Sequence, residues 1–106
     1  MTPTKSNYLD IPDDYVHEIV ARCGESQQDA VLSEECGELI QAVTKTLRQK
    51  NAGKPVNNSA LAEEMAHVLI CIRTTMLAHG ITPEDIQEHI DYKIDKYQDK
   101  SYAGNI

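Results

Sequence analysis

Apolar residues recur at every third or fourth position along four segments of this 106-residue chain. That spacing places them on one face of an α-helix, whereas a half-buried strand alternates apolar and polar residues, which no stretch here does. Turn-forming residues separate the segments at Gly24, at 51–58 and at Gly80. The sequence therefore predicts an all-α fold, a four-helix bundle with short loops.

Capping residues and glycines mark the expected helix ends, which gives helices over about 12–23, 27–50, 58–79 and 83–100. Asn58 or Ser59 is a good N-cap for the third helix, and Thr82 followed by proline is one for the fourth. The polar ends, 1–9 and 101–106, are expected to be flexible. The faces expected to be buried are, helix by helix, Val16, Ile19, Val20 and Cys23; Leu32, Cys36, Leu39, Ile40, Val43 and Leu47; Leu61, Met65, Val68, Leu69, Ile72 and Met76; Ile86, Ile90, Ile94 and Tyr97.

The length fits a single domain over 1–106, and a domain this small buries only a modest share of its surface when alone. Packing against a second copy would remedy this, so an oligomer is expected. The net charge of −7 argues against a nucleic-acid polymer as partner, because phosphate contacts need Lys and Arg. No apolar run is long enough to cross a bilayer, and no signal-peptide core follows the first residues, so a cytoplasmic location is expected.

Three cysteines, Cys23, Cys36 and Cys71, are an odd number without the spacing of a metal site or a disulfide framework. Each lies within an apolar helical pattern. We therefore expect reduced cysteines that serve as buried packing residues.

Carboxylates gather at helical spacing in the two central segments. Glu35 and Glu38 are three residues apart, Glu34 also reaches Glu38, and Glu64 and His67 form a second pair. If the two helices pack antiparallel, these side chains can face one another across a single cleft. Oxygen ligands of this kind suit Mg²⁺, which keeps several waters for a phosphate substrate.

The alternative is that these glutamates lie on solvated helix surfaces, as most do. Two features argue against it. Like charges three or four residues apart repel by about a few tenths of a kcal/mol, which a cation would offset. The strip that carries Glu35 and Glu38 also carries Val31 and Ala42, so it is expected to be half-buried. Gly37, between the carboxylates, suggests either close approach of a neighbouring helix or ligand, or a tolerated surface glycine.

A family resemblance arises from these motifs. Glu34-Glu35-Cys36-Gly37-Glu38-Leu39, with Glu63-Glu64-Met65-Ala66-His67-Val68 about 25 residues later, resembles the paired Glu-x-x-Glu and Glu-x-x-Asp motif of MazG-like nucleotide pyrophosphohydrolases. That superfamily also includes dimeric dUTPases, dCTP pyrophosphatases and phosphoribosyl-ATP pyrophosphohydrolases. The similarity spans about residues 28–97.

The resemblance implies the all-α NTP pyrophosphatase fold, dependence on Mg²⁺, and hydrolysis of a nucleoside triphosphate (NTP or dNTP) to the monophosphate and pyrophosphate. It also implies assembly as a homodimer or homotetramer. Carried over position by position, Glu35, Glu38 and Glu64 would be metal ligands. Glu34 would be a further ligand or would orient the attacking water, and Glu34 or Glu38 would act as general base.

One position departs from the family pattern, because His67 stands where the family has its final Asp. An imidazole is a softer ligand than a carboxylate and suits Mg²⁺ poorly. Three outcomes stay open. The site uses Mn²⁺ or another transition metal with His67 as a ligand, it binds Mg²⁺ weakly with His67 outside the first coordination shell, or the protein is an inactive MazG-like relative that binds a nucleotide or a partner.

Substrate contacts are expected from Lys93 and Lys96 of the last helix, in a region where the family places cationic residues that hold phosphates. The alternative is that they pair with neighbouring aspartates on a solvated face. Gln28, on the strip of Glu35, is a candidate to contact base or ribose, or is simply a surface residue.

Two further alternatives concern the whole chain. Glu64-x-x-His67 is also the pair used by ferritin-like di-iron proteins, but those need two such pairs, and the sequence offers one in the right context. A purely structural helical bundle would bind no metal.

Overall fold

The structure is a computed structural model that describes residues 9–99, so the flexibility predicted for the two ends falls, apart from residue 9, outside the described residues. Within this range the chain is all-α and contains no strand, which confirms the predicted fold class. The elements are α1 (Asp13–Cys23), the short 3-10 helix η2 (Glu25–Gln27), α2 (Gln28–Asn51), α3 (Asn58–His79) and α4 (Pro83–Gln98).

The helix ends lie close to their predicted places. Gly24 ends α1 with a positive φ of 86°, and Thr82 caps α4 in a capping box with Asp85. The cap of α3 is Asn57, whose side chain accepts a 3.0 Å hydrogen bond from the backbone N–H of Ala60. The expected cap, Asn58 or Ser59, was therefore one or two residues late, because three consecutive side chains here can all cap a helix.

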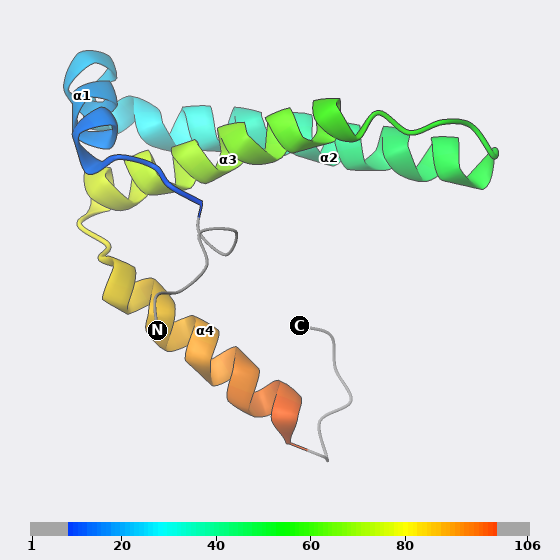
Figure 1. The fold of residues 1–106 in the computed structure, drawn as a ribbon. Helices are drawn as coiled ribbons and strands as arrows, with labels where there is room; N and C mark the ends of the chain where they lie inside the picture. Colours follow the sequence, from blue (N-terminus) through cyan, green and yellow to red (C-terminus); the bar gives the residue numbers. More distant parts are fainter. Residues whose placement is uncertain (1–8, 100–106) are drawn as a thin grey trace.

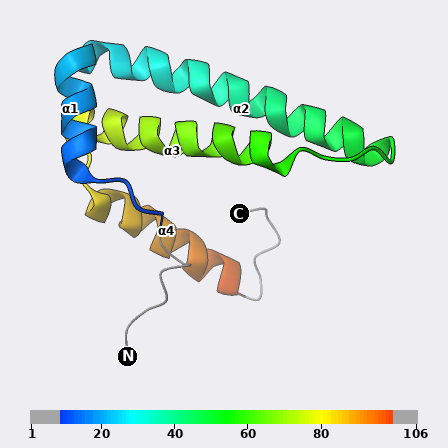
Figure 2. The same cartoon turned by 45° about the horizontal axis from the view of Figure 1, so that its top comes forward.

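Helices α2 and α3 lie side by side and antiparallel over most of their length (Figures 1 and 2). Helix α1 lies across the end of this hairpin where α2 begins and α3 ends, and it packs mainly on α3. The buried apolar residues are Val16, Val20 and Met76 at this end and Val68 near the middle of α3. Gln28 and Thr74 are buried among them.

The seam between α2 and α3 is built from small and polar side chains. On α2, this seam is followed by Gln28, Glu35, Ala42 and Thr46, at successive spacings of seven, seven and four residues, and all of them are buried or half-buried. Three of the larger apolar residues expected to be buried, Ile40, Val43 and Leu47, are 46% to 66% exposed. The other members of the predicted stripe, Leu32, Cys36 and Leu39, are half-buried. In the single chain, half of the predicted α2 stripe therefore faces outward.

The outward stripes of the two helices form one continuous surface. At about 100° per residue, each stripe lies roughly a quarter turn from the seam in the same rotational sense. Because the helices are antiparallel, both stripes then lie on the same side of the hairpin. We call this surface the apolar side; it comprises Ile40, Val43, Leu47, Met65, Leu69 and Ile72, all at least 36% exposed.

Helix α4 leaves the hairpin and shares no packed interface with it (Figure 1). Its predicted inner face, Ile86, Ile90, Ile94 and Tyr97, is exposed along its whole length. One chain therefore does not close a four-helix bundle, and the bundle stays a prediction for an oligomer.

Two smaller expectations can be compared with the structure. Cys23 is exposed at the end of α1, so the prediction that it is buried was wrong, whereas Cys36 and Cys71 are half-buried free thiols. A Cβ added at Gly37 would meet no atom within 4 Å, so no helix of the same chain approaches this glycine closely.

Within residues 9–99, no single helix is both long and apolar enough to cross a membrane. Helices α3 and α4 reach the required length and composition only when taken together, and the chain bends by 119° between them.

Candidate metal centre

Four side chains converge midway along the hairpin. Glu35 and Glu38 come from α2, and Glu64 and His67 come from α3, and each offers one ligand atom within 4.8 Å of the others. We call these residues the acidic cluster. The Nδ1 atom of His67 lies 3.4 Å from Oε2 of Glu35 and 3.8 Å from Oε2 of Glu64.

Helix geometry explains why the four residues meet. A spacing of three residues places both members of each pair on the same side of their helix. The antiparallel packing of α2 and α3 then turns the two pairs toward each other across the seam. The structure thus brings together the four residues that the motif indicated as metal ligands.

Two oxygens in the acidic cluster lack a hydrogen-bond partner. Oε2 of Glu35 and Oε2 of Glu64 are each buried as atoms, and neither accepts a hydrogen bond. Their side chains as a whole stay 23% and 24% exposed, so the cluster is sheltered but open to solvent on one side. Buried carboxylate oxygens without partners are unfavourable unless a cation or a proton compensates them.

The pKa of Glu35 is raised above its ordinary value. Burial of the carboxyl is the main cause, and the charge of Glu38 raises the pKa further, whereas His67 opposes the shift. The same surroundings act on a neighbouring thiol, because burial and then the charge of Glu35 raise the pKa of Cys71. Cys71 therefore stays a neutral thiol, which is a poor metal ligand.

A hollow of about 410 Å³ opens beside the acidic cluster, and it is lined by Glu38, Gln41, Ala42, Lys45, Ala60, Glu63 and Glu64. Lys45 also lines a neighbouring hollow of about 330 Å³ together with Arg48 and Lys54. Sequence reasoning missed Lys45. Its spacing of seven residues from Glu38 was the available signal, because two helical turns return to the same side of the helix. Both hollows lie on the side of the hairpin opposite the apolar side.

The other residues expected at the site are not gathered here. Glu34 is exposed and lies outside the acidic cluster. Lys93 and Lys96 are exposed on α4, where the ammonium group of Lys96 lies 5.5 Å from the ring centroid of Tyr92. Because α4 shares no packed interface with the hairpin, the single chain does not bring these lysines to the carboxylates.

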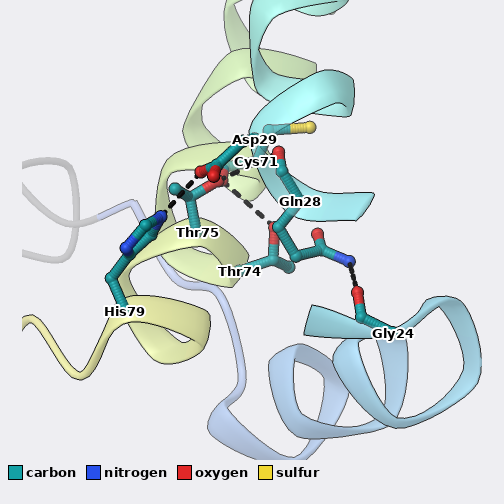
Figure 3. Close-up of polar contacts among 7 residues, drawn as sticks. All are labelled: Gly24, Gln28, Asp29, Cys71, Thr74, Thr75 and His79. Carbon is teal, nitrogen blue, oxygen red and sulfur yellow. Dashed lines mark hydrogen bonds and ion pairs between the residues drawn. The ribbon is translucent and has the colours of Figure 1, made fainter. Parts of the chain in front are cut away.

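Gln28 is buried at the joint between α1, α2 and α3, where it is 2% exposed (Figure 3). Its side-chain amide donates a 3.0 Å hydrogen bond to the carbonyl of Gly24, and its backbone carbonyl accepts one of 3.3 Å from the hydroxyl of Thr75. Beside it, Nε2 of His79 lies 2.7 Å from Oδ1 of Asp29. This contact links the end of α3 to the start of α2. The expectation that Gln28 contacts a base or ribose stays a prediction.

Comparisons with protein-family models, with curated proteins and with solved structures each found no match to this chain.

Replacing Gln28 by Ala should destabilise the fold by about 1–3 kcal/mol, because the Gly24 carbonyl loses its partner and a small cavity forms. Urea unfolding at fixed protein concentration measures the change. Gln27→Ala is the matched control, since Gln27 is exposed and caps no backbone group, and it should stay within about 0.5 kcal/mol of the wild type. Equal effects of the two variants would contradict the structural role of Gln28.

Replacing Glu35 by Gln should raise the thermal midpoint of the metal-free protein at pH 7, because it removes one of the facing charges. The raised pKa of Glu35 means that its carboxylate destabilises the fold above the folded-state pKa and costs nothing below its ordinary value of 4.5. The gain should therefore shrink as the pH falls toward 4.5. Melting in chelator across this range tests it, with the exposed Glu34→Gln as control. A midpoint below that of the wild type at pH 7 would contradict it.

Proposed function

We propose that this protein is a MazG-like nucleotide pyrophosphohydrolase that uses a divalent metal to hydrolyse an NTP or dNTP to the monophosphate and pyrophosphate. The observation that carries the proposal is the convergence of the acidic cluster, in which two buried carboxylate oxygens lack a hydrogen-bond partner. The paired motif supplies the reaction class. A nucleotide substrate and a homodimer or homotetramer belong to the same proposal.

The donor set fits a divalent ion. Glu35, Glu38 and Glu64 offer oxygens and His67 offers a nitrogen within a span that one ion can bridge after small side-chain movements. Mg²⁺ and Mn²⁺ are the candidates, and the imidazole favours Mn²⁺. When bound, the ion would neutralise phosphate charge and make a coordinated water more acidic.

Glu38 is the better candidate for general base. It is the exposed member of the acidic cluster and lines the adjoining hollow, so it can reach a water that attacks the α-phosphorus. The proton would pass to Glu38 as the bond from phosphorus to the leaving pyrophosphate breaks. Glu34 remains the alternative base, although it lies outside the cluster.

Phosphate charge would be balanced by Lys45 within the chain. It lines both hollows, so its flexible side chain could bring an ammonium group toward a triphosphate bound beside the carboxylates. Lys93 and Lys96 can take part only if α4 reaches a site, whether its own or that of a second copy.

A second candidate function follows from His67. With one carboxylate fewer than the family motif, the chain could hold a nucleotide or a partner without turnover. This alternative shares the binding site with the first, and turnover distinguishes the two.

Pyrophosphate release, measured over canonical nucleotides with Mg²⁺ and with Mn²⁺, tests the proposal. We expect turnover, a loss of at least about 100-fold for Glu64→Gln, and a raised KM for Lys45→Ala because a phosphate contact is lost. Lys50→Ala is the matched control, since Lys50 lies on the same helix but lines neither hollow. Binding without turnover under every condition would instead support the inactive relative.

Replacing His67 by Asp should restore the family's carboxylate and raise the affinity for Mg²⁺ on the order of tenfold, because Mg²⁺ prefers oxygen ligands. Isothermal titration with Mg²⁺ and Mn²⁺ measures this without relying on activity. His17→Asp adds the same charge on α1, outside the acidic cluster, and should change neither affinity. An unchanged ratio of the two affinities in His67→Asp would place His67 outside the coordination shell.

A further inference from the structure

Two apolar surfaces of the chain are uncovered. One is the apolar side of the hairpin. The other is the ridge of α4, which we define as Ile86, Ile90, Ile94 and Tyr97, with exposed fractions of 38% to 63%. Single exposed hydrophobic residues are ordinary, but continuous apolar faces mark interaction surfaces.

The hinge between α3 and α4 keeps the ridge away from the hairpin of its own chain. Gly80 has a left-handed φ of 70°, and the N–H of Ile81 donates a 2.9 Å hydrogen bond to the carbonyl of Met76, which terminates α3. The capping box of Thr82 and Asp85 fixes the start of α4. Both ends of this short hinge are therefore tied by hydrogen bonds, and the chain turns by 119° through it (Figure 2).

We propose that the α4 ridge docks on the apolar side of the hairpin of a second copy, and that the second copy does the same in return. The inference deepens the oligomer put forward with the proposed function and depends on neither the metal nor the activity. One twofold pairing would cover both surfaces at once, because each chain carries a ridge and a surface that can receive it.

The available area matches what a stable dimer needs. The ten side chains of the two surfaces are 36% to 66% exposed. At roughly 200 Å² for a full side chain, they present on the order of 1,000 Å² per copy, above the roughly 800 Å² per partner of a standard interface. The radius of gyration of 16.9 Å, against about 13 Å for a compact domain of this length, likewise shows that one copy alone is not compact.

The charges of α4 allow this docking. Its acidic residues are on the face opposite the ridge at about 100° per residue, namely Glu84, Glu88, Asp91, Asp95 and Asp99. Lys93 lies between members of the ridge and lines the same face of α4, so docking must keep its ammonium group at the rim of the interface, in contact with water, while its apolar stem is covered. The acidic cluster and its hollow open on the other side of the hairpin and would stay accessible.

Light scattering on the full chain after size exclusion tests the proposal. We expect about twice the chain mass of 11.8 kDa for the wild type, and a monomer for Ile90→Asp on the ridge and for Val43→Asp on the apolar side. Tyr92→Asp is the matched control: it adds the same charge on the same helix, 60% exposed and off the ridge, and should stay dimeric. Circular dichroism verifies that each variant remains helical.

Cross-linking distinguishes this pairing from one in which two hairpins pack face to face. In a chain carrying Cys23→Ser and Cys71→Ser, Ile90→Cys should form a dimer with Cys36 of the second copy through a bifunctional maleimide, whereas Tyr92→Cys should not. A monomeric wild type would overturn the proposal. So would a dimer that survives Ile90→Asp, or one that cross-links through Cys36 alone, or a monomer that binds only an unrelated protein. Hydrolysis is not measured, so failure here leaves the proposed activity untouched.

Discussion

The seam between α2 and α3 determines most of what this chain can do. It brings Glu35 and Glu64 together from opposite helices, and small residues such as Ala42 and Ala60 flank them. Such a seam gains little from apolar burial and carries repelling charges, so packing alone does not account for it. A bound cation, or a proton, would turn the repulsion between the facing carboxylates of the seam into an attraction. That is the arrangement expected of a functional site, where local stability is given up for chemistry.

How far the sequence predicted this structure depends on the kind of signal. Helix number and ends followed from spacing, from Gly24 and from Thr82, because caps and turns are local interactions. The meeting of Glu35, Glu38, Glu64 and His67 was also predictable, since a three-residue spacing and antiparallel packing leave few other arrangements.

The sequence did not predict which surface covers each apolar face, because that depends on what packs against the face. The apolar stripe of Ile40, Val43 and Leu47 indicates that a face is buried, but not whether its own chain or another copy buries it. The same holds for Lys93 and Lys96, whose distance from any site depends on where α4 goes. Lys45 was missed for a different reason: its seven-residue spacing from Glu38 is a weak signal for a lone lysine, and it gains meaning only when the hollow beside it is seen.

Under the proposed function and docking, the two long sides of the hairpin would keep two incompatible requirements apart. Association gains from removing water around apolar side chains, whereas a phosphate site needs charged groups, a metal and access for a highly charged substrate. If both lay on the same side, docking would desolvate Glu38 and Lys45 and cost more than the apolar contact returns. Because the apolar side and the hollow face opposite directions, the chain can bury one without closing the other. The same geometry explains why Ala42 and Ala60 flank the acidic cluster: large side chains there would push α2 and α3 apart and separate the four residues that the hairpin brings together.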